Sequence, residues 1–220
     1  MLKEISRYPA FCLLLIALPP VTARAGVVIE GTVTLPSVRA TTPAARYQQI
    51  SGTVAEPEPP TAVVYLDGSF PGVKHVDREA LEVAQQGYQF APGLLAVQQG
   101  TEVAFPNKDD DYHHVFSYSK SKSFDLGRYR MGEEAPRITF DVGGAVTVGC
   151  EIHDHMRGTI LVLETPYFTR TDSAGKYRLE IPEAVSGAFT LRAWISPRQV
   201  FGQPVQLEDG ATLNIDFADK

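Results

Sequence analysis

Hydrophobic and polar positions alternate in short segments along most of the chain. Because successive side chains of a strand point to opposite faces of its sheet, such alternation predicts β-strands. Clusters of Gly, Pro and Asp separate the segments, as between many short strands. Only 77–86 has a helical composition. The predicted strands cover 27–35, 62–66, 94–97, 102–105, 113–118, 138–142, 146–149, 159–163, 167–170, 177–181, 189–195, 205–207 and 213–217.

The spacing of these strands predicts an all-β protein with a sandwich as its main unit. Residues 37–60 are rich in proline and lack a period, which is typical of a linker. After Thr165-Pro166 a new set of alternating segments begins. We expect these to form a second β unit, with Glu208-Asp-Gly210 as a hairpin turn. This last stretch is too short to bury much surface alone. The strand at 27–35 is therefore a candidate to complete it.

The N-terminal segment has the layout of a secretory signal peptide. Lys3 and Arg7 precede an apolar run over 10–18, and Ala23-Arg-Ala25 offers a small-residue cleavage site. The apolar run is shorter than the roughly 20 residues that a membrane-spanning helix needs. We expect cleavage after Ala25, no membrane span in the mature protein, and a periplasmic location.

Composition and charge narrow the possible partners. With 44% hydrophobic and 21% charged residues, the chain is expected to be globular. Cleavage after Ala25 would change the formal net charge from −6 to −8. An acidic protein of this kind is not expected to bind nucleic acid or anionic membranes, and is expected to meet a partner with a basic surface.

Cleavage would also remove Cys12 and leave Cys150 as the single thiol. A lone cysteine in an oxidising compartment cannot form an intramolecular disulfide, and it is a liability unless something holds it. Metal ligation is a physical reason to keep it.

The segment around that cysteine carries the candidate chemistry. Cys150, His153 and Met156 lie within seven residues, and His113 lies upstream in another predicted strand. A thiolate, a thioether and imidazoles together select copper, and a His2Cys plane with a weak axial Met is the arrangement of blue-copper sites. Alternation lets only one of His113 and His114 face inward. Zinc also accepts Cys and His ligands, so a zinc-holding structural module stays an alternative.

The remaining histidines, the acidic run and the tryptophan are not predicted to bind a metal or cofactor. We expect His114 and His155 to lie beside the metal or face solvent rather than bind it, and His75 to lie on the surface. The acidic run 109–111 lacks the spacing of an EF-hand and is predicted to be a solvated loop. Trp194 is expected to belong to the core.

Familiar enzyme motifs do not occur in the chain. G-x-S-x-G, H-E-x-x-H, the Walker A motif and G-x-G-x-x-G are all missing, so the sequence predicts a protein that is not an enzyme. Two functional classes fit: a carrier of single electrons, and a copper-binding or delivery protein without a role in electron transfer.

Several of these motifs together resemble the cupredoxins of the plastocyanin and amicyanin group. The resemblance covers roughly Thr61 to Thr165, and the whole chain is similar to the periplasmic cupredoxins of the methylamine-utilisation type. Plastocyanin-like proteins usually carry Asn at the position of His114, where it ties the upstream strand to the ligand loop. The motifs that carry the resemblance are Phe90-Ala-Pro92, 100–107, Asp109, His113-His-Val-Phe116 and Cys150-x2-His153-x2-Met156.

The resemblance implies a Greek-key sandwich that holds one type 1 copper centre. It names His113 as the upstream ligand and Cys150, His153 and Met156 as the others. It also implies electron transfer with a periplasmic redox protein, such as a dehydrogenase or a c-type cytochrome.

The C-terminal stretch is similar to carboxypeptidase-regulatory-like, or transthyretin-like, β domains. The similarity lies in Thr171-Asp-x2-Gly-x-Tyr-x-Leu and in the strand bearing Trp194. The division of the chain is then predicted as a signal peptide (1–25), an N-terminal strand and linker (26–60), a cupredoxin domain (61–165) and a C-terminal β domain (166–220).

Overall fold

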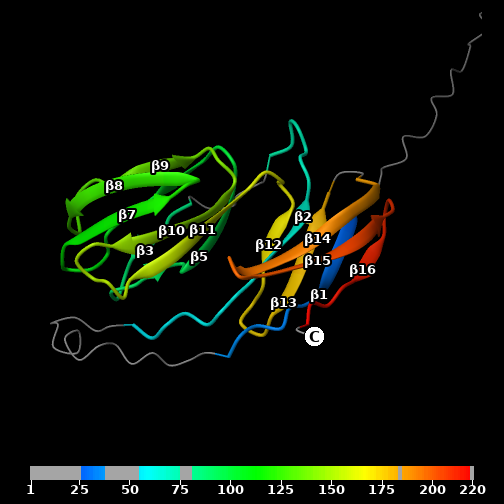
Figure 1. Cartoon of the computed structure of the whole chain (residues 1–220), viewed down its shortest axis with the longest axis horizontal. Helices are drawn as coiled ribbons and strands as arrows, with labels where there is room; N and C mark the ends of the chain where they lie inside the picture. Colours follow the sequence, from blue (N-terminus) through cyan, green and yellow to red (C-terminus); the bar gives the residue numbers. More distant parts are fainter. Residues whose placement is uncertain (1–25, 38–54, 75–80, 183–184, 219–220) are drawn as a thin grey trace, which may run out of the picture.

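The structure is a computed structural model, and it describes residues 26–37, 55–74, 81–182 and 185–218. The predicted signal peptide, most of the predicted linker, His75 and the first part of the predicted helix 77–86 lie outside these ranges. The described residues form sixteen strands and no helix, so none of them belongs to a helix that could span a membrane. The prediction of an all-β fold with two units is confirmed (Figure 1).

The larger unit is a sandwich built around one apolar core. Five strands form a sheet in the order β5-β11-β10-β7-β8, and the short pairs β6-β9 and β3-β4 complete the unit. Phe90, Phe105 and Phe140 are fully buried between them. The strands are β3 (Ala84–Gln85), β4 (Phe90–Ala91), β5 (Leu94–Gln98), β6 (Thr101–Ala104), β7 (His113–Ser119), β8 (Lys122–Tyr129), β9 (Arg137–Phe140), β10 (Gly144–Cys150) and β11 (Arg157–Leu163).

The second unit packs a three-stranded sheet, β13-β1-β16, against a four-stranded sheet, β12-β2-β14-β15. Ile29, Leu179 and Leu191 are among the side chains buried between these sheets. The predicted sharing of the first strand is seen here, because β1 pairs antiparallel with β13 and parallel with β16. The strands are β1 (Val27–Thr32), β2 (Val63–Asp67), β12 (Phe168–Arg170), β13 (Lys176–Ile181), β14 (Gly187–Ser196), β15 (Gln199–Leu207) and β16 (Thr212–Asn214).

The position of β2 differs from the predicted boundary at Thr61. The sequence places this strand in the first domain, but β2 pairs with β12 and β14 of the second sandwich. The reason is its inward face, since Val64 and Leu66 pack into the same core as Leu191. The second sandwich therefore takes strands from both sides of the larger one along the chain.

Three local predictions also need correction. The described part of the predicted helix 77–86 is extended, because Val83 and Gln85 donate backbone hydrogen bonds to Ala104 and Pro106. The turn at Glu208-Asp-Gly210 does not close a hairpin, since β16 pairs with β1. Strand β8, which the alternation did not predict, pairs with β7 along its length.

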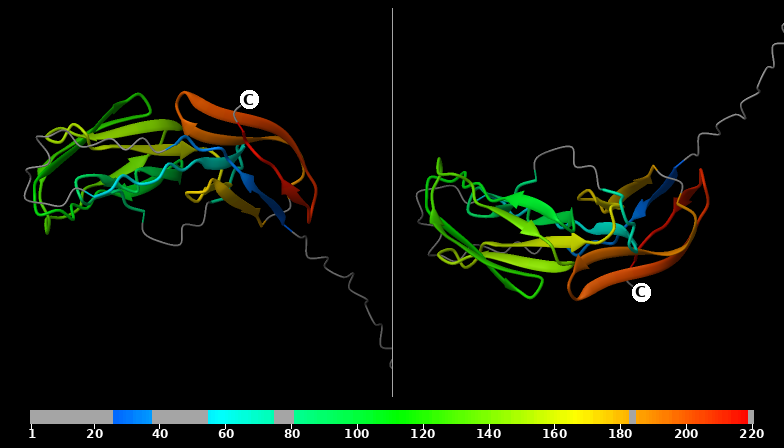
Figure 2. Two further views of the ribbon diagram at one scale, coloured as in Figure 1. Left: turned by 90° about the horizontal axis from the view of Figure 1, so that it is seen from below. Right: turned by 90° about the horizontal axis from the view of Figure 1, so that it is seen from above.

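The two sandwiches contact each other through a separate apolar cluster. Leu161 and Leu163, on the outer face of β11, pack with Phe168 and Trp194 of the four-stranded sheet. Figures 1 and 2 show the sandwiches side by side, with β5 and β11 nearest the second unit. The start of β7 and the end of β10 lie at the opposite end of the larger sandwich (Figure 1).

Candidate metal centre

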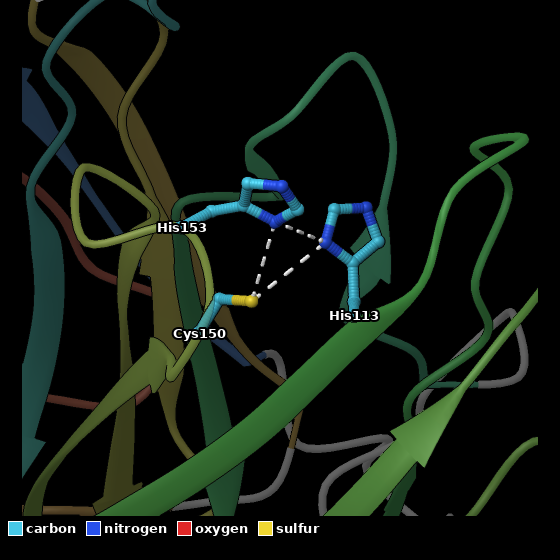
Figure 3. A group of neighbouring side chains, drawn as sticks. All are labelled: His113, Cys150 and His153. Atoms are coloured by element: carbon cyan, nitrogen blue, oxygen red, sulfur yellow. Dashed lines mark hydrogen bonds between the residues drawn. The ribbon is translucent and has the colours of Figure 1, made fainter. Parts of the chain in front are cut away.

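Three potential ligands converge at that far end of the larger sandwich. His113 is the first residue of β7, Cys150 is the last residue of β10, and these two strands are neighbours in one sheet. His153 lies in the turn that follows β10 and points back toward both (Figure 3). All three side chains are buried, so the donor atoms are largely shielded from water.

Backbone hydrogen bonds fix the short segment that carries His153 and Met156. The amide of Met156 donates to the carbonyl of His153 at 2.9 Å, and the amide of Cys150 donates to the carbonyl of Met156 at 3.4 Å. Glu151 donates to the carbonyl of His114 at 2.9 Å, which ties the segment to β7. Cys-x2-His-x2-Met therefore forms one closed turn.

The distances between the donor atoms suit a single metal ion. His113 Nδ1 lies 3.1 Å from His153 Nδ1, and Cys150 Sγ lies 3.7 and 3.6 Å from these two nitrogens. Donors so spaced can all reach one ion at the roughly 2.0 to 2.3 Å lengths typical of zinc–nitrogen and zinc–sulfur bonds. Within the described ranges, this is the single group of three or more such residues that could hold a metal.

Burial and neighbouring hydrogen bonds shift the pKa of each of the three groups. Burial acts to lower the pKa of His113, but hydrogen bonds to Cys150 and Asp109 outweigh it and raise this pKa. Burial acts to raise the pKa of Cys150, yet hydrogen bonds from His113 and from the amides of His114 and Ile152 lower it overall. Burial, followed by the charge of His113, lowers the pKa of His153. The cluster thus favours a thiolate beside a neutral His153, the states in which both can bind a metal.

The fourth predicted ligand, Met156, also belongs to this region. Its side chain is buried in the same core cluster as Cys150 and Val115, and the turn described above ties its backbone to His153. A thioether is a soft ligand that favours copper over zinc.

The neighbouring histidines lie outside the group of three. His114 turns outward, with Nε2 at 2.5 Å from Asp125 Oδ1 and Nδ1 at 3.7 Å from a Glu151 oxygen. The centre of the His155 ring lies 6.3 Å from that of His153. Of the paired histidines, only His113 faces the core, as the alternation predicts.

One residue beside the site was missed from the sequence. The prediction of a solvated acidic loop holds for Asp110, whose side chain is 88% exposed, but is wrong for Asp109, which is 11% exposed. Asp109 Oδ2 lies 2.9 Å from His113 Nε2, the ring nitrogen on the far side of the ring from Nδ1, which lies near Cys150 and His153. Asp109 and His113 both belong to the motifs that carry the family resemblance, but the direct contact between their side chains was not predicted.

A tyrosine ring also packs against the two histidines of the site. The ring of Tyr88 meets those of His113 and His153 edge-on, with centres 5.7 and 5.2 Å apart. Burial and the neighbouring Asp111 carboxylate raise the pKa of Tyr88 to about 12, so its hydroxyl stays protonated. Tyr88 therefore packs an uncharged ring against the imidazoles of His113 and His153.

No protein-family model and no curated protein sequence matches the chain. Among solved structures, it is similar to a Cu-containing nitrite reductase (NirK) from Thermus scotoductus SA-01, at 27% identity and a TM-score of 0.37, over 45% of this chain and 26% of that one. It is also similar to a purple cupredoxin from Nitrosopumilus maritimus, at 19% identity and a TM-score of 0.34, over 37% of this chain and 98% of the other.

A third similar structure is a methionine-to-alanine mutant of amicyanin in its Cu(I) form. The identity is 20% and the TM-score 0.36, over 45% of this chain and 97% of that one. Each match covers less than half of this chain, so the case for a metal centre depends on the side chains at the end of β7 and β10.

Proposed function

We propose that this protein is a periplasmic type 1 copper protein that carries single electrons between redox partners. The observation that carries the proposal is the convergence of three buried donors, Cys150 Sγ and the Nδ1 atoms of His113 and His153, at one end of a rigid sandwich. The buried thioether of Met156 supports copper as the metal.

The residues of the chain have distinct parts in this proposal. Copper, when bound, would supply the reversible change between Cu(II) and Cu(I). Neighbouring strands and the closed turn hold His113, Cys150 and His153 in place, so that the ligands move little between the two states. His153 belongs to the turn at this end of the sandwich, and the small exposed edge of its ring, 8% of the side chain, is the proposed contact with a redox partner.

The location and the partner belong to the same proposal. The predicted signal peptide supports export to the periplasm, where dehydrogenases and c-type cytochromes are partners of the right kind. The acidic composition supports a basic docking surface on that partner, because complementary charge speeds encounter.

Copper loading tests the central claim. Mature protein with one equivalent of Cu(II) is expected to show an intense visible thiolate-to-copper band, which Cys150→Ser abolishes. Tyr118→Ala, at an exposed position of the same strand as His113, is the matched control and is expected to keep the band. A colourless copper complex of the unchanged protein would refute the proposal.

A second measurement separates an electron carrier from a delivery protein. A carrier is expected to undergo reversible one-electron oxidation and reduction while keeping its copper in the presence of a Cu(I) chelator. Rapid transfer of Cu(I) to the chelator, without a reversible potential, would favour delivery instead.

A further inference from the structure

The carboxylate of Asp109 lies between a ligand imidazole and a pair of backbone amides. Its Oδ2 atom is 2.9 Å from His113 Nε2 and 3.0 Å from the amide nitrogen of Tyr88, and its Oδ1 atom is 2.6 Å from that of Gly87. An ionised carboxylate can only accept hydrogen bonds, so a neutral imidazole that bonds to it carries its proton on Nε2. This leaves Nδ1 of His113 to face Cys150 and His153.

From this geometry we infer that Asp109 is a positioning residue for the metal centre. It holds His113 in the tautomer that presents Nδ1 to the metal, and it makes this imidazole a better ligand for the oxidised ion. The inference rests on the proposed copper function.

The backbone that holds the carboxylate is shaped for an anion. Gly87 and Tyr88 have φ values of 64° and 57°, and these consecutive left-handed residues aim two successive amides at Asp109. Such concave pairs of N–H groups bind negative charge. Left-handed conformations are uncommon for a residue with a bulky side chain, so the loop keeps an unfavourable backbone geometry at Tyr88.

The other side of Asp109 is fixed as well. Its amide donates to the side-chain oxygen of Asn107 at 2.9 Å. Asn107 in turn donates to the carbonyls of Asp111 and Tyr129 at 2.8 and 3.0 Å, which anchors the loop to the end of β8. These hydrogen bonds hold the carboxylate of Asp109 in one position. The carboxylate can therefore fix the orientation of the His113 ring.

A fixed anionic acceptor has a direct chemical effect on a ligand. When a metal-bound imidazole donates its second N–H to a carboxylate, its orientation is fixed and its basicity rises. The hydrogen bond is charge-assisted, and it strengthens as the ring becomes more positive. The ring is more positive beside Cu(II) than beside Cu(I), so Asp109 stabilises the oxidised state more than the reduced state.

Imidazole nitrogen NMR of the metal-free protein tests the positioning without copper. In its neutral form, His113 is expected to carry its proton on Nε2, and this proton is expected to exchange slowly with water. A neutral His113 with its proton on Nδ1 would overturn the inference, whatever the copper-loaded protein does.

Reduction potentials of loaded variants test the effect on the metal. Asp109→Asn is expected to weaken binding of Cu(II) about tenfold more than binding of Cu(I), because a neutral acceptor forms a weaker hydrogen bond. A tenfold change corresponds to a rise of about 59 mV for one electron. Asp110→Asn removes the same charge from the adjacent, exposed position, and it is expected to shift the potential much less.

The two proposals can fail separately. Equal potentials for Asp109→Asn and Asp110→Asn, with the visible band intact in the unchanged protein, would overturn the role of Asp109 and leave the copper function standing. An unchanged protein that lacks the band would refute the copper function.

Discussion

The backbone amide of His114 donates to the sulfur of Cys150 across 3.5 Å, while the imidazole of His114 turns away toward Asp125. The link between this position and the sulfur of Cys150 is thus made by the main chain. Plastocyanin-like proteins usually have Asn here, and the structure shows that the amide-to-sulfur contact does not require that side chain.

Replacing His114 with Asn is therefore expected to preserve the centre. The visible band and the stoichiometry of one copper should be retained, and the free energy of unfolding should fall by about 0.5–1.5 kcal/mol, because the largely buried imidazole loses its hydrogen bond to Asp125. Absorption spectra and thermal unfolding measure both effects. His113→Asn is the contrasting variant and is expected to lose the band. Loss of the band in His114→Asn would show that the imidazole itself supports the site.

Met156 combines packing with a predicted ligand role, and two substitutions separate these. Met156→Ala is expected to destabilise the protein by about 2–5 kcal/mol, because it opens a cavity in the core. Met156→Leu keeps most of the volume and should cost less than about 1.5 kcal/mol.

Both Met156 variants are expected to change the potential and the spectrum of the copper-loaded protein, since both remove the thioether. Thermal unfolding of the metal-free variants and voltammetry of the loaded ones provide the comparison. A Met156→Leu variant with an unchanged spectrum and potential would exclude sulfur ligation.

The thiol of Cys150 is expected to titrate at unusually low pH in the metal-free protein. The hydrogen bond from His113 and the nearby amides outweigh burial and lower its pKa, so the ultraviolet absorbance of the thiolate should appear below the ordinary value of about 8.5. A lowered pKa stabilises the fold above the pKa of the unfolded state. This contribution is lost as the pH falls through the folded value.

His113→Gln is the matched variant for that titration. It removes the imidazole that lies 3.7 Å from the sulfur, so the midpoint should rise toward the ordinary value. A midpoint that stays unchanged in His113→Gln would contradict the assigned cause of the shift.

The contact between the two sandwiches is expected to contribute to stability. Leu161→Ala removes a buried side chain from the cluster that includes Trp194, at an expected cost of about 2–5 kcal/mol. The fluorescence of Trp194, the only tryptophan of the chain, reports on this cluster during unfolding. Val142→Ala, at an exposed position, is the control and should change stability by no more than about 0.5 kcal/mol. Equal stabilities of the two variants would show that the sandwiches pack independently.

The sequence predicted those parts of the fold that depend on local alternation. Strand β13 alternates strictly between apolar buried and polar exposed residues, so its position can be recognised along the chain. Strand β8 could not be recognised in this way, because its polar and glycine residues have low strand propensity, and it forms at the edge of a sheet through pairing with β7. The partners of β2 depend on contacts distant in sequence, which alternation does not encode.

The candidate site was predictable to a similar degree. His113, Cys150 and His153 could be chosen because their chemical types coincide with strand ends and a short turn, and the structure brings these three together. Asp109 is among the motif residues, but its contact with His113 could not be predicted, because an acidic run usually remains solvated. Its burial depends on the amides of Gly87 and Tyr88, which come from a loop that lies 22 and 21 residues away along the chain.

The central place of β1 has a consequence for the order of folding. This strand lies between β13 and β16, so its two edges are covered by segments from the last part of the chain. During synthesis from the N-terminus, β1 stays unpaired until these late segments emerge from the ribosome. The larger sandwich contains only residues that emerge earlier, so it can fold first. Contacts so distant in sequence form slowly, so β1 stays unpaired for longer than the strands of the larger sandwich.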